Sequence, residues 1–461
     1  MPFNLVARAT GKTIPLTALN EDGLAAWLAK AGKKTAAWVE GANFSAICGE
    51  TLLLPGDDGA LAGALLGVDD ANDVWSWSAA VDTLPPGRYA VAKSMGKDQA
   101  TNAALGWALG TYGFDRYTKV DAPEAELVWP AKADRGAVLS AASSVSLTRD
   151  LINTPSSDMG PAELAGAARK LAREFKAKFS VIVGDDLLKK NYPMVHAVGR
   201  ASDRAPRLID IRWGKPSDPK VTIVGKGVCF DSGGLDLKPP TGMKLMKKDM
   251  GGAATTLGLA RMIMMAGLPV RLRVLVPAVE NSVSGNAFRP LDVLHSRAGI
   301  TVEIGNTDAE GRLILADALY EGASEKPELM INFATLTGAA RVALGPELPV
   351  MFANNDALAD DLAKHGERIG DPVWRLPLWK PYRRTLNSKV ADLNNIGEMP
   401  QGGAITAALF MNEFVDAGVP WAHFDIMAWN TSSRPGRPAG GEAMAMRAAF
   451  ATIAARFGKS K

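Results

Sequence analysis

The chain has 461 residues, of which 47% are hydrophobic and 22% charged, a mix typical of folded globular proteins and not of disordered or fibrous ones. Its 52 lysines and arginines nearly balance 49 acidic residues, so the net charge of +3 gives no reason to expect a nucleic-acid or membrane surface. The length exceeds one ordinary hydrophobic core, and we therefore expect two domains.

Neither a secretory signal nor a membrane span is predicted. The N-terminus lacks a long apolar run behind its basic residues, and no stretch approaches the roughly 18 consecutive apolar residues that suggest a membrane helix. The two cysteines, Cys48 and Cys229, stand far apart and form no metal-binding spacing. So few cysteines suit a reducing compartment, and we expect a cytoplasmic protein.

The first 125 residues predict a small α/β unit, with helices at 21–33 and 99–109 and strands at 48–54 and 89–93. The tripeptide Gly11-Lys12-Thr13 resembles part of a phosphate-binding loop. Val6 stands where the first glycine of that motif belongs, so the motif is incomplete.

A domain boundary is predicted near residue 135. Residues 121–135 are rich in proline, alanine and charged side chains, as in a connector. Residues 136–153 then predict a linker helix that ends before Thr154-Pro155, because the residue before a proline disfavours helix. We expect an N-terminal α/β domain with its connector over 1–135 and a larger domain over 136–461.

Strands alternate with helices in the larger domain, which predicts an α/β fold with a mixed, mostly parallel sheet flanked by helices. Strands are expected at 179–183, 208–213, 221–224, 272–278, 301–304, 329–334, 348–353 and 422–427. Helices are expected at 161–178, 253–266, 313–323 and 403–416.

The stretch VTIVGKGVCFDSGG, residues 221–234, carries the first chemical signal. Its apolar start predicts a buried strand, and its glycines predict a tightly turned loop after residue 224. Lys226 and Asp231 lie in that loop, where α/β sheets present side chains to a crevice. Burying such charges is costly, and metal binding is the expected reason.

Three further clusters have the same character. Lys238 follows closely, Asp249 begins DMGGAATT, and NTDAEGRL contains Asp308, Glu310 and Arg312. We expect all of them at strand-to-helix junctions around one crevice, where so many carboxylates would repel unless cations neutralise them. Two divalent ions about 3.5 Å apart, bridged by carboxylates, can hold a bridging hydroxide and polarise a carbonyl, which is hydrolytic chemistry.

The basic residues have separate expected roles. Lys226 could be a ligand only if neutral, which a directly bound cation can enforce, whereas Lys238 and Arg312 would stay charged. One of the two can stabilise an oxyanion, and a guanidinium can hold a small oxyanion through two nitrogens. The four histidines are scattered without an H-E-x-x-H motif, so a carboxylate and lysine site is favoured over a histidine zinc site.

Each piece alone has a simpler interpretation. Aspartates near glycines commonly form turns or helix caps, Glu310 and Arg312 could be a solvated surface pair, and Lys238 a surface lysine. Capping does not explain two lysines, an arginine and four carboxylates in successive junctions, so the ensemble favours a site.

The segments VGKGVCFDSGGLDLKP, MKKDMGGAAT and NTDAEGRLILADAL closely resemble the signatures of the leucyl (cytosol) aminopeptidase family, and the similarity covers roughly residues 140–461. The resemblance implies a dinuclear metallo-aminopeptidase that hydrolyses the first residue from peptides with a free N-terminus. It implies two divalent cations, zinc or manganese with magnesium or cobalt as alternatives, and a bicarbonate ion. A cytoplasmic homohexamer without a membrane or nucleic-acid partner is expected.

The family's site residues transfer position by position. The ligands of its tighter metal site match Lys226, Asp231, Asp249 and Glu310, and those of its more exchangeable site match Asp231, Asp308 and Glu310.

Other positions match groups that contact the substrate. Lys238 matches the lysine that polarises the scissile carbonyl, Arg312 the arginine that holds bicarbonate as general base, and Asp249 a ligand of the substrate amine. Positions matching the substrate pocket are Met246, Thr335, Leu336 and Gly338.

The sequence departs from the family before Asp249, where M-D-E-M-K-Y-D-M is usual. Here Lys244, Leu245 and Lys248 replace two acids and an aromatic residue, which makes the site more positive. This predicts better tolerance of acidic N-terminal residues than in a typical relative.

Two alternatives belong to other functional classes. A nonenzymatic binding protein that kept the fold should have lost ligands, and here every matched ligand is present. A phosphoryl-transfer enzyme should carry a complete phosphate loop, which the chain lacks.

Overall fold

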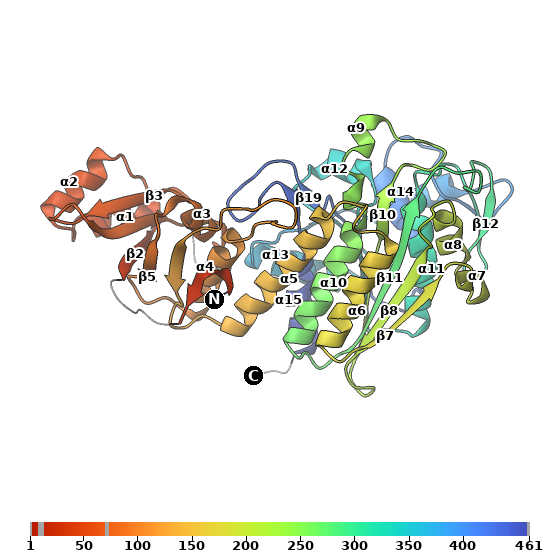
Figure 1. Cartoon of the computed structure of the whole chain (residues 1–461). Coiled ribbons are helices and arrows are strands. Elements are labelled where there is room, and N and C mark those ends of the chain that lie inside the picture. Colours follow the sequence, from red (N-terminus) through yellow and green to blue (C-terminus); the bar gives the residue numbers. More distant parts are fainter. Residues whose placement is uncertain (1, 8–12, 70–72, 459–461) are drawn as a thin grey trace. The chain divides into compact units, whose positions relative to one another are not determined.

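The computed structural model describes residues 2–7, 13–69 and 73–458, and the chain divides into two compact units (Figure 1). One unit contains Met1–Ser146 together with Ser432–Ala439, and the other contains Leu147–Thr431 and Gly440–Lys461. Gly11 and Lys12 of the incomplete phosphate motif lie outside the described residues. The domain boundary at residue 135 stays a prediction.

The first unit contains a six-stranded sheet in the order β1-β6-β5-β2-β4-β3, in which only β3 is antiparallel to its neighbour. Its strands are β1 (Leu5–Val6), β2 (Ile14–Leu19), β3 (Thr51–Pro55), β4 (Leu61–Gly67), β5 (Gly87–Val91) and β6 (Ala125–Val128). Its helices are α1 (Glu21–Leu28), α2 (Lys33–Gly41), α3 (Trp75–Thr83) and α4 (Lys97–Gly110), and α5 (Arg135–Asn153) begins in this unit.

The helix predicted at 21–33 ends already at Leu28, and a separate helix, α2, begins at Lys33. Asn20 caps α1 by accepting a hydrogen bond from the Gly23 N–H. Gly32 has an extended backbone and precedes α2, so the helical path breaks between Leu28 and Lys33. Apolar periodicity alone did not reveal this break, because Leu24, Trp27 and Leu28 continue one apolar pattern up to it.

The second unit contains a nine-stranded mixed sheet in the order β16-β15-β18-β14-β9-β11-β8-β7, with β10 also paired to β11. Its central strands are parallel, and antiparallel pairs lie toward both edges, which confirms the predicted fold class. The strands are β7 (Lys178–Val183), β8 (Arg207–Trp213), β9 (Lys220–Gly225), β10 (Gly227–Asp231), β11 (Arg271–Asn281), β14 (Leu329–Ala334), β15 (Val350–Ala353), β16 (Trp374–Arg375) and β18 (Trp421–Asp425).

Helices cover both faces of this sheet, which explains the unbroken apolar runs of its central strands (Figure 1). The longer helices are α6 (Pro161–Glu174), α10 (Gly251–Met265), α11 (Glu310–Ser324), α13 (Asp356–Arg368), α14 (Gly403–Asn412) and α15 (Met446–Phe457). Shorter ones are α7 (Asp186–Lys189), α8 (Pro193–Gly199), α9 (Pro240–Met243) and α12 (Gly338–Leu344). Among the described residues, no helix has both the length and the apolarity needed to cross a membrane.

Glycine lets α10 approach the centre of the sheet. A Cβ atom at Gly252 would lie 2.2 Å from the carbonyl oxygen of Phe333 in β14. On β9, a Cβ atom at Gly225 would lie 2.7 Å from the Cα atom of Ala253. Larger residues at either position would push α10, and the residues that precede it, away from β9 and β14.

Two sequence expectations near the site are corrected. The predicted loop after residue 224 is largely strand β10, which pairs in parallel with β11, and the chain turns only at Gly233 and Gly234, where φ is 91° and 68°. Strand β13 (Thr301–Glu303) lies outside the main sheet, in a small sheet with β12 (Val293–His295) and β17 (Leu393–Asn394). Strand order depends on distant pairing, which local apolar runs do not encode.

His423 is fully buried in β18, between the rings of Phe352 and Trp421, with its Nδ1 atom 2.9 Å from the Asn332 amide nitrogen. Burial lowers the pKa of His423 to about 3. Because the unfolded chain binds a proton here near pH 6.5 and the folded chain does not, stability is lost as the pH falls from about 6.5 toward 3, by about 1.4 kcal/mol per pH unit.

We therefore expect the His423 imidazole to stay neutral from about pH 8 down to pH 5. NMR titration of the ring nitrogens checks this, with the exposed His295 as a reference signal in the same chain. Protonation of His423 between these pH values would contradict the prediction.

Candidate metal centre

Lys226 occupies the centre of the site, between β9 and β10 and not in the tightly turned loop that the sequence predicted. Its backbone N–H donates to the Phe333 carbonyl at 3.0 Å, and its side chain is only 3% exposed. The Nζ atom lies 2.7 Å from Oδ2 of Asp249 and 2.9 Å from Oε1 of Glu310, and it donates to the Thr335 carbonyl at 3.0 Å. One ammonium thus joins acids from two separate segments.

The acids come from elements on different sides of β9. Asp249 lies in the short 3₁₀ helix Met246–Met250 that precedes α10, and Glu310 is the first residue of α11. Asp231 ends β10, and its Oδ1 atom accepts hydrogen bonds from the Gly233 N–H and the Asn281 amide, each at 2.9 Å. Single oxygens of Asp231, Asp308 and Glu310 lie within 4.8 Å of one another, a spacing that suits a shared cation.

The cluster also passes a test of fit for a divalent cation. Oε2 of Glu310 is buried and accepts no hydrogen bond from the described residues, while Oε1 of Glu310 and Oδ2 of Asp249, also buried, contact the Lys226 ammonium. Buried carboxylate oxygens normally have donors or bind metals, so these oxygens are suited to a hard cation.

Electrostatics agree with this arrangement. Burial, with the charge of Asp231, raises the pKa of Glu310 above its ordinary value. Burial alone would lower the pKa of Lys226, but Asp249, Glu310 and Asp231 outweigh it and raise that pKa. The carboxylates therefore carry more negative charge than their buried surroundings tolerate, and added positive charge would stabilise them.

Lys238 forms a second ion-paired centre on the cavity side. Its Nζ atom lies 2.9 Å from Oδ2 of Asp231 and also pairs with Oδ1 of Asp308. Asp236 and Thr307, which the sequence did not single out, connect the loop after β10 to the loop before α11. The Thr307 N–H donates to Asp236 Oδ2 at 2.7 Å, and the Asp236 N–H donates to Thr307 Oγ1 at 2.8 Å.

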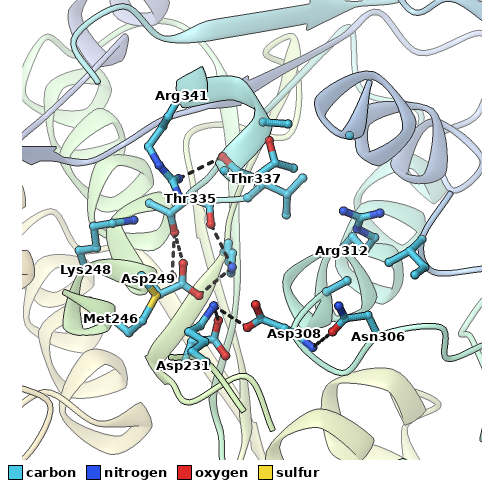
Figure 2. Close-up of a pocket in the computed structure, with 18 residues that line it drawn as sticks. Asp231, Met246, Lys248, Asp249, Asn306, Asp308, Arg312, Thr335, Thr337 and Arg341 are labelled. Atoms are coloured by element: carbon cyan, nitrogen blue, oxygen red, sulfur yellow. Dashed lines mark hydrogen bonds and ion pairs between the residues drawn. The ribbon is translucent and has the colours of Figure 1, made fainter. Parts of the chain in front are cut away.

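Arg312 lies on the opposite side of the cavity from Met246 and Lys248 (Figure 2). It is 8% exposed, and its Nη1 atom donates to the Asn395 carbonyl at 2.6 Å. Burial lowers the pKa of Arg312 to about 10, so the guanidinium stays charged at neutral pH.

The structure brings every predicted site residue to one region. A cavity of about 390 Å³ is lined by the predicted residues Lys226, Asp231, Lys238, Met246, Asp249, Asp308, Arg312, Thr335, Leu336 and Gly338. Glu310 lies behind Lys226 and does not line the cavity. Asn306, Thr337 and Arg341 also line it, and no sequence signal pointed to Arg341 because the short helix α12 was not predicted.

Comparisons with known proteins identify the family of this chain. The catalytic domain of the cytosol aminopeptidase family matches residues 146–450, and the N-terminal domain of M17 aminopeptidases matches residues 14–130. A probable cytosol aminopeptidase of Roseiflexus castenholzii is 45% identical over 295 residues, which are 63% of this chain and 60% of that relative's length.

Two solved structures are similar over nearly the whole chain. A cytosol aminopeptidase from Coxiella burnetii has a TM-score of 0.93 at 49% identity, covering 98% of this chain and 99% of that one. The bottromycin maturation enzyme BotP, solved in complex with Mn, has a TM-score of 0.86 at 34% identity, covering 97% of this chain and all of that one.

Fold and site together define a metal-dependent peptidase of the hydrolase class. The family match covers more than half of the chain, and the chain belongs to the cytosol aminopeptidase family. The resemblance stated from the sequence motifs is confirmed.

Gly311 gives a test of the packing around Lys226. A Cβ atom there would lie 2.5 Å from Cε and 2.6 Å from Nζ of Lys226. We expect Gly311→Ala to displace the lysine, to weaken metal binding and to destabilise the fold by roughly 1–3 kcal/mol. Thermal unfolding and metal content measure both effects.

Gly166→Ala is the matched control, because Gly166 lies in α6 and a Cβ atom there would meet nothing within 4 Å. That variant should gain about 0.5–1 kcal/mol from helix propensity. Equal behaviour of the two variants would contradict the expected crowding of Lys226.

Proposed function

We propose that this chain releases the N-terminal residue of peptides at a dinuclear metal site in the cavity. The observation that carries the proposal is the convergence of Asp231, Asp249, Asp308 and Glu310 around the buried amine of Lys226. A purely structural ion pair does not require four acids to gather around two lysines beside a cavity.

Two overlapping sets of ligands are available. Lys226, Asp231, Asp249 and Glu310 would hold one cation, and Asp231, Asp308 and Glu310 would hold the second. Zinc or manganese fits this donor set, with magnesium or cobalt as alternatives. When bound, two such cations acidify water and polarise a carbonyl group.

Asp249 would bind the free amine of the substrate. Its Oδ1 atom accepts a hydrogen bond from Thr335 Oγ1 at 2.6 Å, and this contact orients the carboxylate. A peptide that lacks a free amine would not make this contact with Asp249, which restricts the reaction to the first residue. Met246, Leu336 and Gly338 would contact the side chain and backbone of that residue.

Lys238 and Arg312 would assist the hydrolysis from the cavity side, each in a different role. The Lys238 ammonium is held by Asp231 and Asp308 and would stabilise the developing oxyanion. The Arg312 guanidinium, anchored by the Asn395 carbonyl, would hold a bicarbonate ion that accepts the proton as general base.

The remaining assignments rest on the resemblance to the family. We assign the catalytic domain to residues 136–461, a cytoplasmic location to the protein and a homohexameric state to its assembly. The small net charge supports peptides, and not nucleic acid, as the partner.

Metal dependence is tested by removing and restoring the ions. We expect dialysis against a chelator to abolish release of N-terminal residues, because the carboxylates and Lys226 supply no nucleophilic water by themselves. Restoring zinc, manganese, magnesium or cobalt separately should recover activity, most with zinc or manganese. Full activity in protein shown by elemental analysis to be metal-free would contradict the proposal.

Lys238→Met tests oxyanion stabilisation. We expect kcat to fall by about 10²–10³-fold with bound metal unchanged, because one preorganised donor is lost from the transition state. The exposed Lys190 gives the control, and Lys190→Met should leave kcat unchanged. A kcat within a few fold of the original, or a loss of bound metal, would contradict this role for Lys238.

A further inference from the structure

Lys248 is a buried cation on the cavity wall. It lies in the 3₁₀ helix Met246–Met250, is 2% exposed, and lines the cavity beside Met246 (Figure 2). Within residues 2–7, 13–69 and 73–458 its ammonium makes no hydrogen bond or ion pair. Burying an ammonium without a partner is costly, so an acidic group next to Lys248 would stabilise it.

A second cation lies on the same side of the cavity. Arg341, from α12, is half-buried, and its Nη1 atom donates to the Thr337 carbonyl at 3.0 Å. Figure 2 shows Arg341 and Lys248 on one side, with Arg312 across the cavity. Lys248 and Arg341 both line this cavity, so two basic side chains face the same region.

The acids that face Lys248 already have other partners. Asp425 accepts hydrogen bonds from the N–H groups of Leu336 and Thr337, at 3.0 and 3.2 Å, and from Thr337 Oγ1 at 2.6 Å. Asp249 pairs with Lys226 and Thr335. Because these groups are held by other donors, neither serves as a close partner for Lys248 or Arg341.

We propose that Lys248 and Arg341 form a subsite for the side-chain carboxylate of an N-terminal glutamate or aspartate. The inference rests on the proposed aminopeptidase function and names the substrate class of the same cavity. With its amine at Asp249, a substrate places its first side chain against the wall that carries Met246 and Lys248. A carboxylate there would form charge-assisted hydrogen bonds, whereas leucine would leave the ammonium unpartnered.

The structure also separates the residues that the sequence grouped together. Lys244 and Leu245 depart from the family as Lys248 does, yet neither lines the cavity, and Lys244 is exposed. The predicted tolerance of acidic residues is therefore assigned to Lys248 with Arg341. Lys244 provides a matched control.

The test compares glutamyl and glutaminyl p-nitroanilides, which differ in charge and hardly in shape. We expect the metal-loaded enzyme to favour the glutamyl substrate at least about tenfold in kcat/KM. Lys248→Met and Arg341→Met should each reduce that ratio toward one, and Lys248→Arg should retain it. Lys244→Met should leave the ratio unchanged, and leucyl p-nitroanilide reports whether each variant is folded and active.

Binding gives a readout that does not depend on turnover. Calorimetry with free L-glutamate and L-glutamine should show tighter binding of glutamate, and this difference should disappear in Lys248→Met. A ratio of one or less in the original protein, or a ratio unchanged by both substitutions, would overturn the subsite. Failure to cleave any of the three anilides would instead overturn the proposed function.

The carboxylate of a short peptide's C-terminus is the other acid that could reach this wall. Leucyl-alanine and leucyl-alaninamide distinguish it, because they differ only at that terminus. Equal cleavage of the two by the original protein supports the side-chain subsite. A preference for the free acid that is lost in Lys248→Met would overturn it.

Discussion

The contact of the Lys226 ammonium with Asp249 and Glu310 is the interaction around which the catalytic unit is arranged. Lys226 directly follows strand β9. Asp249 lies just before α10, and Glu310 is the first residue of α11. Each acid stands near a helix N-terminus, where the helix dipole favours negative charge. The absence of a side chain at Gly311 leaves the space that the lysine occupies.

The cavity combines two electrostatic environments within a small volume. Its floor holds carboxylates from three segments, and its walls carry Lys248, Arg341 and Arg312. The floor suits cations and a substrate amine, and the walls suit anionic groups. A substrate with a free N-terminal amine and an acidic first side chain carries one positive and one negative charge. The amine matches the acidic floor, and the side-chain carboxylate matches the basic wall. In the proposed function, the same separation of acidic floor and basic walls would serve both metal binding and the choice of substrate.

The sequence predicted which residues gather at the site better than it predicted the topology. Motifs around Asp231, Asp249 and Glu310 singled out carboxylates that the structure brings together, because residue type and spacing carry that information locally. Strand β10 was missed because the glycines at 225 and 227 suggested a turn, whereas pairing with β11 extends the chain there. Arg341 was missed because its place on the cavity wall depends on how a seven-residue helix packs, which no local pattern shows.

The segment Ser432–Ala439 belongs to the first unit although it lies late in the chain. There the Arg437 guanidinium stacks on the ring of Trp75 at 3.6 Å from the ring centre, and Gly436 approaches Ser78 so closely that a Cβ atom would lie 2.4 Å from Oγ. Three covalent crossings therefore connect the two bodies. Replacing the first unit through a single fusion point would therefore leave this late loop without the residues it packs against.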